Sequence, residues 1–177
     1  MLSQEIDHVL LSQEQIQTRV AELGREISRD YADKTPLVVG ILNGSFIFIA
    51  DLVRTFSFHC QVAFIQVSSY YDDTKGSGTV TIKYDPIGDI EGRDILIIED
   101  IIDSGHTLSA LLDLLEQRGP ASVRLCTLLS KPSRREVDIP VDYCGFEIPD
   151  EFAVGYGLDY AGRYRNLPFI GVLNSVV

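Results

Sequence analysis

Three acids and a small-residue turn follow a short apolar run in the middle of the chain. From residue 95 to residue 107 the sequence reads ILIIEDIIDSGHT. The turn DSGHT would place several backbone N–H groups at the start of a helix, a site that favours phosphate. Ser104 and Thr107 add hydroxyl donors. The carboxylates of Glu99 and Asp100 suit the vicinal hydroxyls of a ribose.

The same turn has a simpler interpretation as a helix cap. Asp and Ser are common at the first position of a helix, so Asp103 or Ser104 alone indicates a cap. The complete block favours a phosphate site, because a cap does not require three carboxylates and a glycine in this order.

The surrounding elements alternate between strands and helices. Ser12 and Gln15 form a capping-box pattern that opens an apolar helical stripe, and Pro36 stops it. We predict strands over residues 37–42, 61–67, 79–84, 94–98 and 123–129, helices over 46–55 and 107–118, and a polar loop over 68–78. This order predicts an α/β fold with a mainly parallel sheet, whose ligands bind beyond the carboxyl ends of the strands.

Composition narrows the function classes. The 177 residues suit one domain. The net charge of −11 disfavours nucleic acid and anionic membranes as partners. Three cysteines, an acidic N-terminus without a signal peptide and no apolar run near ~20 residues predict a cytoplasmic protein.

Five motifs occur in the order typical of one enzyme family. They are Leu42-Asn43-Gly44-Ser45, Ser69-Tyr70, the block 99–107, Lys131, and the run 145–150 that leads into Phe152, Asp159 and Arg165. With them the chain resembles the type I phosphoribosyltransferases, and more narrowly the hypoxanthine-guanine phosphoribosyltransferases of purine salvage.

The resemblance implies the activity and the architecture. The enzymes transfer a 5-phosphoribosyl group from phosphoribosyl pyrophosphate to a 6-oxopurine, with Mg²⁺ as cofactor. The implied fold is one domain over residues 1–177, with a core of about 10–140, a small hood of 141–177 joined by the N-terminal residues, and a mobile active-site loop. The implied partners are small-molecule substrates and further copies of the chain in a homodimer or homotetramer, with no nucleic acid or membrane.

The resemblance also implies roles on the phosphoribosyl side. Glu99 and Asp100 would bind the ribose hydroxyls. Asp159, with these two acids, would bind the metal. The residues implied for the 5′-phosphate are Ser104, Gly105, His106 and Thr107, and those for the pyrophosphate are Arg165 and, at an unusual cis peptide, Asn43 and Gly44.

On the purine side, the family pattern implies that Asp103 acts as general acid or base near N7. Lys131 would donate to the exocyclic O6, Phe152 would stack on the ring, and the carbonyl of Ala153 would accept from a guanine amino group. Ser69 and Tyr70 would lie at the start of a mobile loop that closes over the site as a lid.

Taken singly, several of these residues have ordinary alternatives. Lys131 would be a solvated surface lysine, Phe152 a core residue, Arg165 a surface ion pair and Asp159 a turn cap. The chain also departs from its relatives, which usually carry a basic residue at Asn43.

Further departures and alternatives remain. Asn43-Gly44 also suits an ordinary tight turn. Glu151 stands where a basic residue is frequent, and His106, where many relatives have a lysine or arginine, could donate to phosphate or face solvent. A nucleotide-sensing regulator that binds nucleic acid is the alternative function. Another nucleotide-binding enzyme is disfavoured, because no G-x-x-x-x-G-K-[ST] motif occurs.

Overall fold

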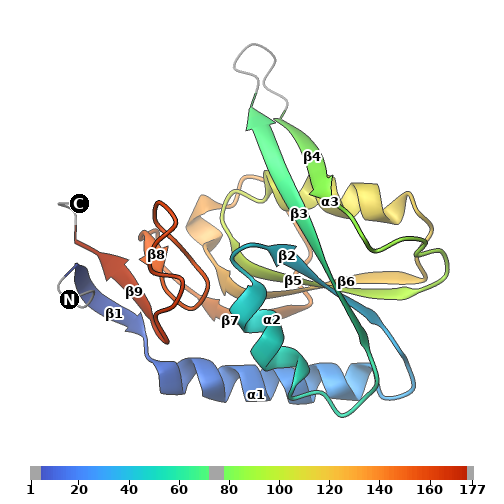
Figure 1. Ribbon diagram of the computed structural model, residues 1–177, viewed down its shortest axis with the longest axis horizontal. Coiled ribbons are helices and arrows are strands. Elements are labelled where there is room, and N and C mark those ends of the chain that lie inside the picture. Colours follow the sequence, from blue (N-terminus) through green and yellow to red (C-terminus); the bar gives the residue numbers. More distant parts are fainter. Residues whose placement is uncertain (1–4, 72–77, 175–177) are drawn as a thin grey trace.

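A six-stranded sheet forms the centre of the molecule (Figure 1). The computed structural model describes residues 5–71 and 78–174, without the side chains of residues 68–71 and 78–81. The strand order is β4-β3-β2-β5-β6-β7, and every neighbouring pair is parallel except β3 with β4. The strands are β2 (Leu37–Leu42), β3 (Gln61–Tyr71), β4 (Gly78–Tyr84), β5 (Asp94–Ile102), β6 (Ser122–Ser130) and β7 (Tyr143–Glu147).

Helices cover both faces of this sheet. Helices α1 (Gln13–Asp30) and α2 (Phe46–Val53) lie on one face, and α3 (His106–Glu116) lies on the other (Figure 1). The strands between them are apolar on both sides. In β5, for example, Leu96 packs in the cluster under α1 and α2, whereas Ile97 packs in the cluster under α3. Burial on both faces accounts for the continuous apolar runs in the sequence.

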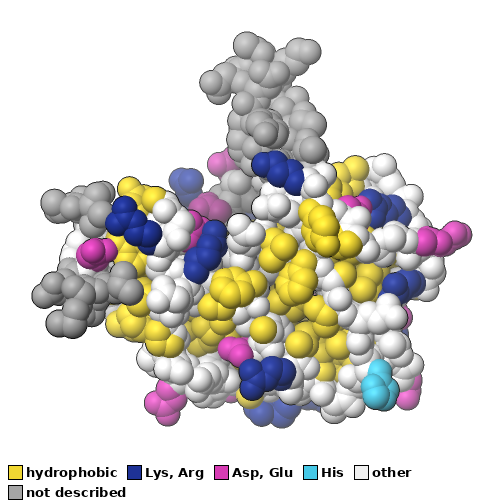
Figure 2. Space-filling model, viewed as in Figure 1, with side chains coloured by type: hydrophobic (Ala, Val, Ile, Leu, Met, Phe, Trp, Pro, Cys, Tyr) yellow, Lys and Arg dark blue, Asp and Glu magenta, His cyan; other side chains and the backbone are white. Residues whose placement is uncertain are grey.

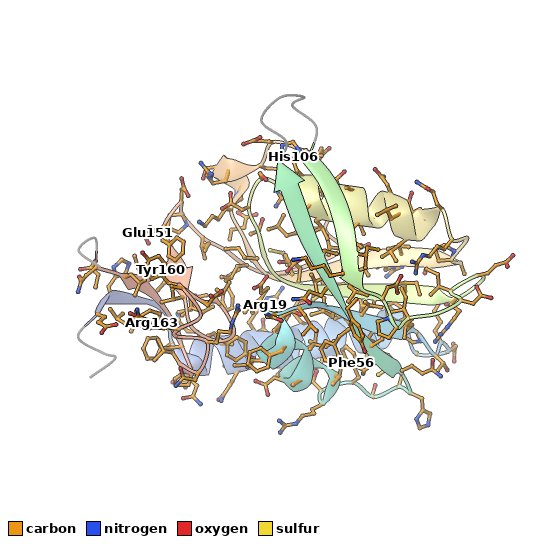
Figure 3. All side chains as sticks on the ribbon, turned by 45° about the horizontal axis from the view of Figure 1, so that its top comes forward. Arg19, Phe56, His106, Glu151, Tyr160 and Arg163 are labelled. Atoms are coloured by element: carbon orange, nitrogen blue, oxygen red, sulfur yellow. The ribbon has the colours of Figure 1, made fainter. Side chains whose placement is uncertain are left out.

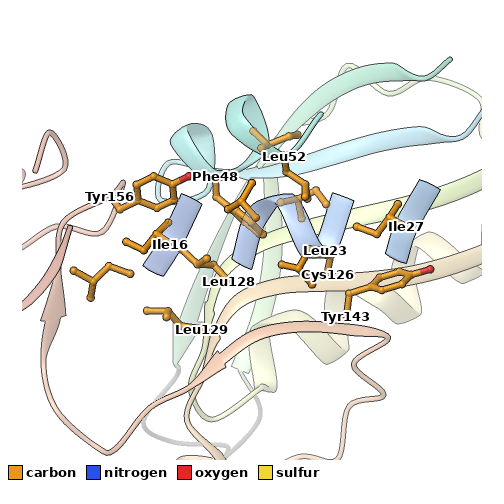
Figure 4. Packing of buried hydrophobic residues seen from close by; sticks show 14 of the residues in the cluster. Ile16, Leu23, Ile27, Phe48, Leu52, Cys126, Leu128, Leu129, Tyr143 and Tyr156 are labelled. Carbon is orange, nitrogen blue, oxygen red and sulfur yellow. The ribbon is translucent and has the colours of Figure 1, made fainter. Parts of the chain in front are cut away.

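The core under α1 is the larger of the two clusters (Figure 4). Ile16, Leu23 and Ile27 of α1 are fully buried there and face Leu52 of α2 and Leu128 of β6. The apolar stripe predicted for this helix is therefore confirmed, as is the capping box of Ser12 and Gln15.

A second, smaller sheet joins the two ends of the chain. It consists of β1 (Ile6–Leu11), β9 (Ile170–Leu173) and β8 (Ala153–Val154), all antiparallel. The hydroxyl of Tyr156 donates to Asp51 of α2 at 2.7 Å, which ties the segment after β8 to the central layer. A 3₁₀ turn, η2 (Pro132–Arg134), follows β6.

The structure confirms the α/β class with a mainly parallel sheet and corrects several boundaries. Residues 68–71, predicted as loop, continue β3, because its antiparallel ladder with β4 extends to Tyr71. The strand predicted over 94–98 runs on to Ile102, since its pairing with β6 continues that far. The helices predicted over 46–55 and 107–118 end earlier, at Val53 and Glu116. Among the described residues, no helix is long and apolar enough to span a membrane.

Candidate active site

The turn between β5 and α3 has the geometry of an anion site. Gly105 precedes the first turn of α3 with φ of +93°, a conformation that favours glycine. No side chain caps this helix, so the alternative in which Asp103 or Ser104 is a cap is wrong. The carbonyl of Ser104 instead accepts from the backbone N–H groups of Glu136 (3.0 Å) and Val137 (3.2 Å), which hold the turn in place.

This turn encloses a hollow of about 160 Å³. Its lining comes from the end of β5 and the start of α3. It therefore contains residues predicted to bind the ribose and residues predicted to bind the 5′-phosphate. The lining residues are Glu99, Ile101, Ile102, Asp103, Ser104, Gly105, Thr107 and Leu108.

His106 is the member of the turn that does not line the hollow. Its Nε2 atom lies 2.9 Å from a carboxylate oxygen of Glu136, and both side chains are largely exposed. Figure 3 places His106 far from Glu151 and Tyr160 of the smaller sheet region. The side chain of His106 is therefore half-exposed beside Glu136, while its backbone begins α3.

Glu99 and Asp100 lie within β5 rather than after it. The Glu99 side chain accepts from the N–H of Asp100 at 3.0 Å, and the Asp100 side chain accepts from the N–H of Ile101 at 2.8 Å. Burial, and then the neighbouring Asp100 carboxylate, raise the pKa of Glu99 well above its ordinary value. A cation or a hydroxyl donor at this point would relieve the crowded pair of acids.

The turn after β2 packs directly on this pair. The Leu42–Asn43 peptide bond is cis, as the resemblance implied, and Gly44 follows it. A Cβ atom on Gly44 would overlap the Asp100 carboxylate, and one on Gly157 would overlap the carbonyl oxygen of Gly44. Asn43 and Gly44 therefore form a tight turn, as the alternative interpretation predicted. This turn packs between β5 and the segment after β8.

Lys131 is buried, with 6% of its surface exposed, so the solvated-lysine alternative is wrong. It directly follows β6, and its Nζ atom lies 3.5 Å from Asp150 and 3.7 Å from Asp103. A buried ammonium requires such acidic neighbours to offset its desolvation. The buried ammonium of Lys131 therefore lies beside the Asp103 carboxylate.

Arg134 was not predicted as a site residue. Its Nε atom donates to Oδ1 of Asp103 at 3.1 Å and lies 3.8 Å from Asp150. The sequence feature that could have indicated Arg134 is Pro132, because proline favours a short turn after Lys131. In a 3₁₀ turn, residues three apart lie on the same side. Lys131 and Arg134 have that spacing, and the N–H of Arg134 donates to the carbonyl of Lys131 at 3.1 Å.

Phe152 is an exposed aromatic side chain rather than a core residue. Its exposed fraction is 56%, and its ring meets Tyr160 edge to face with centroids 5.6 Å apart. Ala153, the next residue, is buried at the start of β8. One face of Phe152 is consequently available to a planar ligand.

Asp159 and Arg165 pair with each other. Their side chains are 2.8 Å apart, and Arg165 also donates to the carbonyl of Gly157 at 2.5 Å. Asp159 accepts from the N–H of Gly162 at 2.8 Å as well. Arg165 therefore forms the ion pair that its ordinary alternative predicted. Asp159 likewise caps a turn, through the N–H of Gly162.

The Mg²⁺ ion implied by the resemblance takes oxygen ligands. Within residues 5–71 and 78–174, no three His, Cys, Asp or Glu side chains converge as a ready metal site. Mg²⁺ is usually held by one or two carboxylates together with substrate phosphates, so such a cage is not required. The adjacent carboxylates of Glu99 and Asp100, one with a raised pKa, fit that kind of binding.

The predicted lid falls mostly outside these observations. The backbones of Ser69 and Tyr70 belong to β3, and their side chains are not described. Residues 72–77 of the predicted loop lie outside the described residues.

The fold and the site together define a class. In a mainly parallel sheet, ligands bind beyond the carboxyl ends of the strands, and a glycine turn that opens a helix at this place suits a phosphate group. The family model described as "Phosphoribosyl transferase domain" matches residues 10–161.

Individual relatives narrow this class. The chain is 52% identical over 177 residues to the hypoxanthine-guanine phosphoribosyltransferase of Bacillus subtilis, covering 100% of this chain and 98% of the relative. It is 51% identical over 166 residues to the hypoxanthine phosphoribosyltransferase of Haemophilus influenzae, covering 92% and 93%. The crystal structure of a hypoxanthine phosphoribosyltransferase from Staphylococcus aureus superposes with a TM-score of 0.94 at 46% identity, covering 98% of this chain and 94% of that one. The chain belongs to the hypoxanthine-guanine phosphoribosyltransferase family.

Proposed function

We propose that this protein transfers the 5-phosphoribosyl group from phosphoribosyl pyrophosphate to hypoxanthine, guanine or both. The products are IMP or GMP and pyrophosphate. The observation that carries the choice of a 6-oxopurine is the buried Lys131, whose ammonium lies beside Asp103. Such a donor binds an exocyclic oxygen and disfavours the amino group of adenine.

The phosphoribosyl group is assigned to the hollow of about 160 Å³. The backbone of residues 104–107 at the start of α3 would hold the 5′-phosphate. Glu99 and Asp100 would accept from the ribose hydroxyls. The turn at Asn43 and Gly44 would present backbone N–H groups to the pyrophosphate.

The purine is assigned to the space between Phe152 and Lys131. Phe152 would stack on the ring through its exposed face, and the carbonyl of Ala153 would accept from a guanine amino group. Arg165, which pairs with Asp159 in this structure, would contact pyrophosphate. Ser69 and Tyr70 would cover the site, since water would otherwise hydrolyse the sugar.

The transfer forms one bond and breaks another. The lone pair of the purine N9 forms a bond to C1′, while the C1′–oxygen bond breaks and its electron pair leaves with pyrophosphate. The proton on N7 passes to the Asp103 carboxylate. Positioned proton transfer of this kind typically contributes ~10²–10⁴-fold in rate.

Glu99, Asp100 and Asp159 are the residues proposed to hold Mg²⁺. When bound, it supplies positive charge against the pyrophosphate. The net charge of −11 makes this local compensation important for a polyanionic substrate.

The decisive experiment mixes the full-length protein with phosphoribosyl pyrophosphate, Mg²⁺ and one base at a time, and measures pyrophosphate release. We expect turnover with hypoxanthine or guanine and none with adenine. A folded sample that turns over no 6-oxopurine would overturn the proposal. Comparing hypoxanthine, guanine and xanthine in steady state then establishes the base preference.

Setting and assembly are also proposals. We propose a cytoplasmic location, supported by the sparse cysteines, and a division into a core of residues 10–140 and a hood that contains the smaller sheet. A homodimer or homotetramer is supported by apolar side chains gathered over β3 and α2 (Figure 2), where Phe46 and Val62 are 42% and 46% exposed. Light scattering would give the mass in solution. That the protein binds no nucleic acid stays a prediction based on its charge.

A further inference from the structure

Two acids and two cations form a compact group beside the hollow, and the proposed function uses only Asp103 and Lys131. Oδ1 of Asp103 accepts from Nε of Arg134 at 3.1 Å. Oδ2 faces Lys131 at 3.7 Å, which is too long for a hydrogen bond. Asp150 also lies close to both cations, at 3.5 Å from Lys131 and 3.8 Å from Arg134. The two oxygens of Asp103 are therefore in different environments.

Stability does not account for the contact between Arg134 and Asp103. Their side chains are 50% and 45% exposed, and ion pairs this exposed contribute roughly 0–1 kcal/mol. Lys131 is the buried member of the group and has Asp150 as a partner. The Arg134 contact instead occupies one oxygen of the Asp103 carboxylate, Oδ1.

We propose that Arg134 is a positioning residue for the transfer step, which rests on the function proposed above. By holding Oδ1, it leaves Oδ2 directed to the side of Lys131, where the N7 proton of the purine would arrive. The terminal torsion of an Asp side chain is broad, so the carboxylate needs an external partner to fix it. Without Arg134, the Asp103 carboxylate would rotate and pair with Lys131. Neither the carboxylate nor the ammonium would then be free to contact the base.

The test compares Arg134→Gln, Arg134→Lys and the control Arg118→Gln in the full-length protein. Arg118 also pairs with an aspartate, Asp85, but contacts none of the proposed site residues. We expect Arg134→Gln to lower kcat about tenfold, a part of the contribution of an acid–base group. KM for phosphoribosyl pyrophosphate and the melting temperature should stay near wild type, Arg134→Lys should recover part of kcat, and Arg118→Gln should behave as wild type.

A double-mutant cycle shows whether Arg134 acts through Asp103. If it does, adding Arg134→Gln to Asp103→Asn causes no further fall in the single-turnover rate, because the effects of linked residues are not additive. A further fall as large as that in the wild-type background, or an unchanged kcat in Arg134→Gln, overturns the inference alone. Absence of turnover in the wild-type protein overturns the proposed function and this inference with it.

Discussion

Gly157 packs so closely on Gly44 that a Cβ atom on Gly157 would overlap the carbonyl oxygen of Gly44. Gly157 has φ of +104°, and its N–H donates to the carbonyl of Arg165 at 2.9 Å. Two segments that are more than a hundred residues apart, the turn after β2 and the loop with Arg165, thus share one contact. Both are proposed to bind pyrophosphate.

We expect Gly157→Ala to raise KM for phosphoribosyl pyrophosphate about tenfold, because a loss of ~1.4 kcal/mol in binding has that effect. The added methyl group would displace the turn at Gly44. Gly88→Ala is the matched control: its φ is +65° and a Cβ atom there has open space. Both variants carry backbone strain of about 1–3 kcal/mol. Gly157→Ala carries the overlap with Gly44 in addition, so its melting temperature should be the lower of the two, and KM is compared at a temperature at which both variants are folded. Equal KM values would show that the contact does not position the pyrophosphate turn.

Asp103→Asn should keep the substrate phosphate bound but lower the rate of the chemical step by ~10²–10⁴-fold. The amide has almost the same shape and cannot accept the N7 proton. Single-turnover kinetics measure the rate, and titration with phosphoribosyl pyrophosphate measures binding. Asp138→Asn, an exposed change on the nearby loop, serves as control. An unchanged rate would remove Asp103 from the acid–base role.

Lys131→Met should raise KM for hypoxanthine by ~10–100-fold, since a hydrogen bond to a charged donor contributes about 1.5–3 kcal/mol. KM for phosphoribosyl pyrophosphate should change little. Lys34→Met is the control, because Lys34 pairs with Asp94 at the opposite, amino-terminal edge of the sheet. If the Lys131 variant retains the wild-type KM for hypoxanthine, the purine O6 binds elsewhere.

Asp30 should contribute a small, pH-dependent stability. A hydrogen bond from Tyr143 (2.6 Å), and then the ion pair with Arg124 (2.7 Å), lower the pKa of Asp30 below its ordinary value of 3.8. A lowered pKa stabilises the fold above the ordinary value, and this contribution is lost as the pH falls from there through the folded pKa. Because the side chain is 45% exposed, the effect is below ~1 kcal/mol.

Urea unfolding of Asp30→Asn tests this sign. The variant should be less stable than wild type at neutral pH, and the difference should shrink in acid. Asp33→Asn, an exposed neighbour, should show no such trend. A constant difference at all pH values would contradict the linkage.

Asn43→Lys should lower KM for phosphoribosyl pyrophosphate and weaken the Mg²⁺ requirement. The family pattern leads us to expect a basic residue at the position of Asn43, so the wild-type protein should depend strongly on the metal for charge compensation. KM measured over a range of Mg²⁺ concentrations, with a chelator as the zero point, checks this. Weak Mg²⁺ dependence of the wild-type protein would count against the expectation.

Local sequence determined the elements and the chemistry of the central block. Residue periodicity predicts the apolar stripe of α1 and the apolar runs of β2 and β5. The local order of small residues predicts the glycine turn before α3. The order of the motifs was enough to predict the enzyme family, which the comparisons confirm. These properties depend on side chains close together in the chain.

Tertiary structure decided what depends on distant partners. Strand β1 pairs with β9 from the other end of the chain, and β3 continues to Tyr71 because β4 supplies the ladder. Lys131 is buried rather than solvated because Asp103 and Asp150, from two other segments, surround its ammonium. The contact of Arg134 with Asp103 likewise spans 31 residues. Burial and ion pairing are properties of residues brought together by the fold, so no local pattern in the sequence contains them.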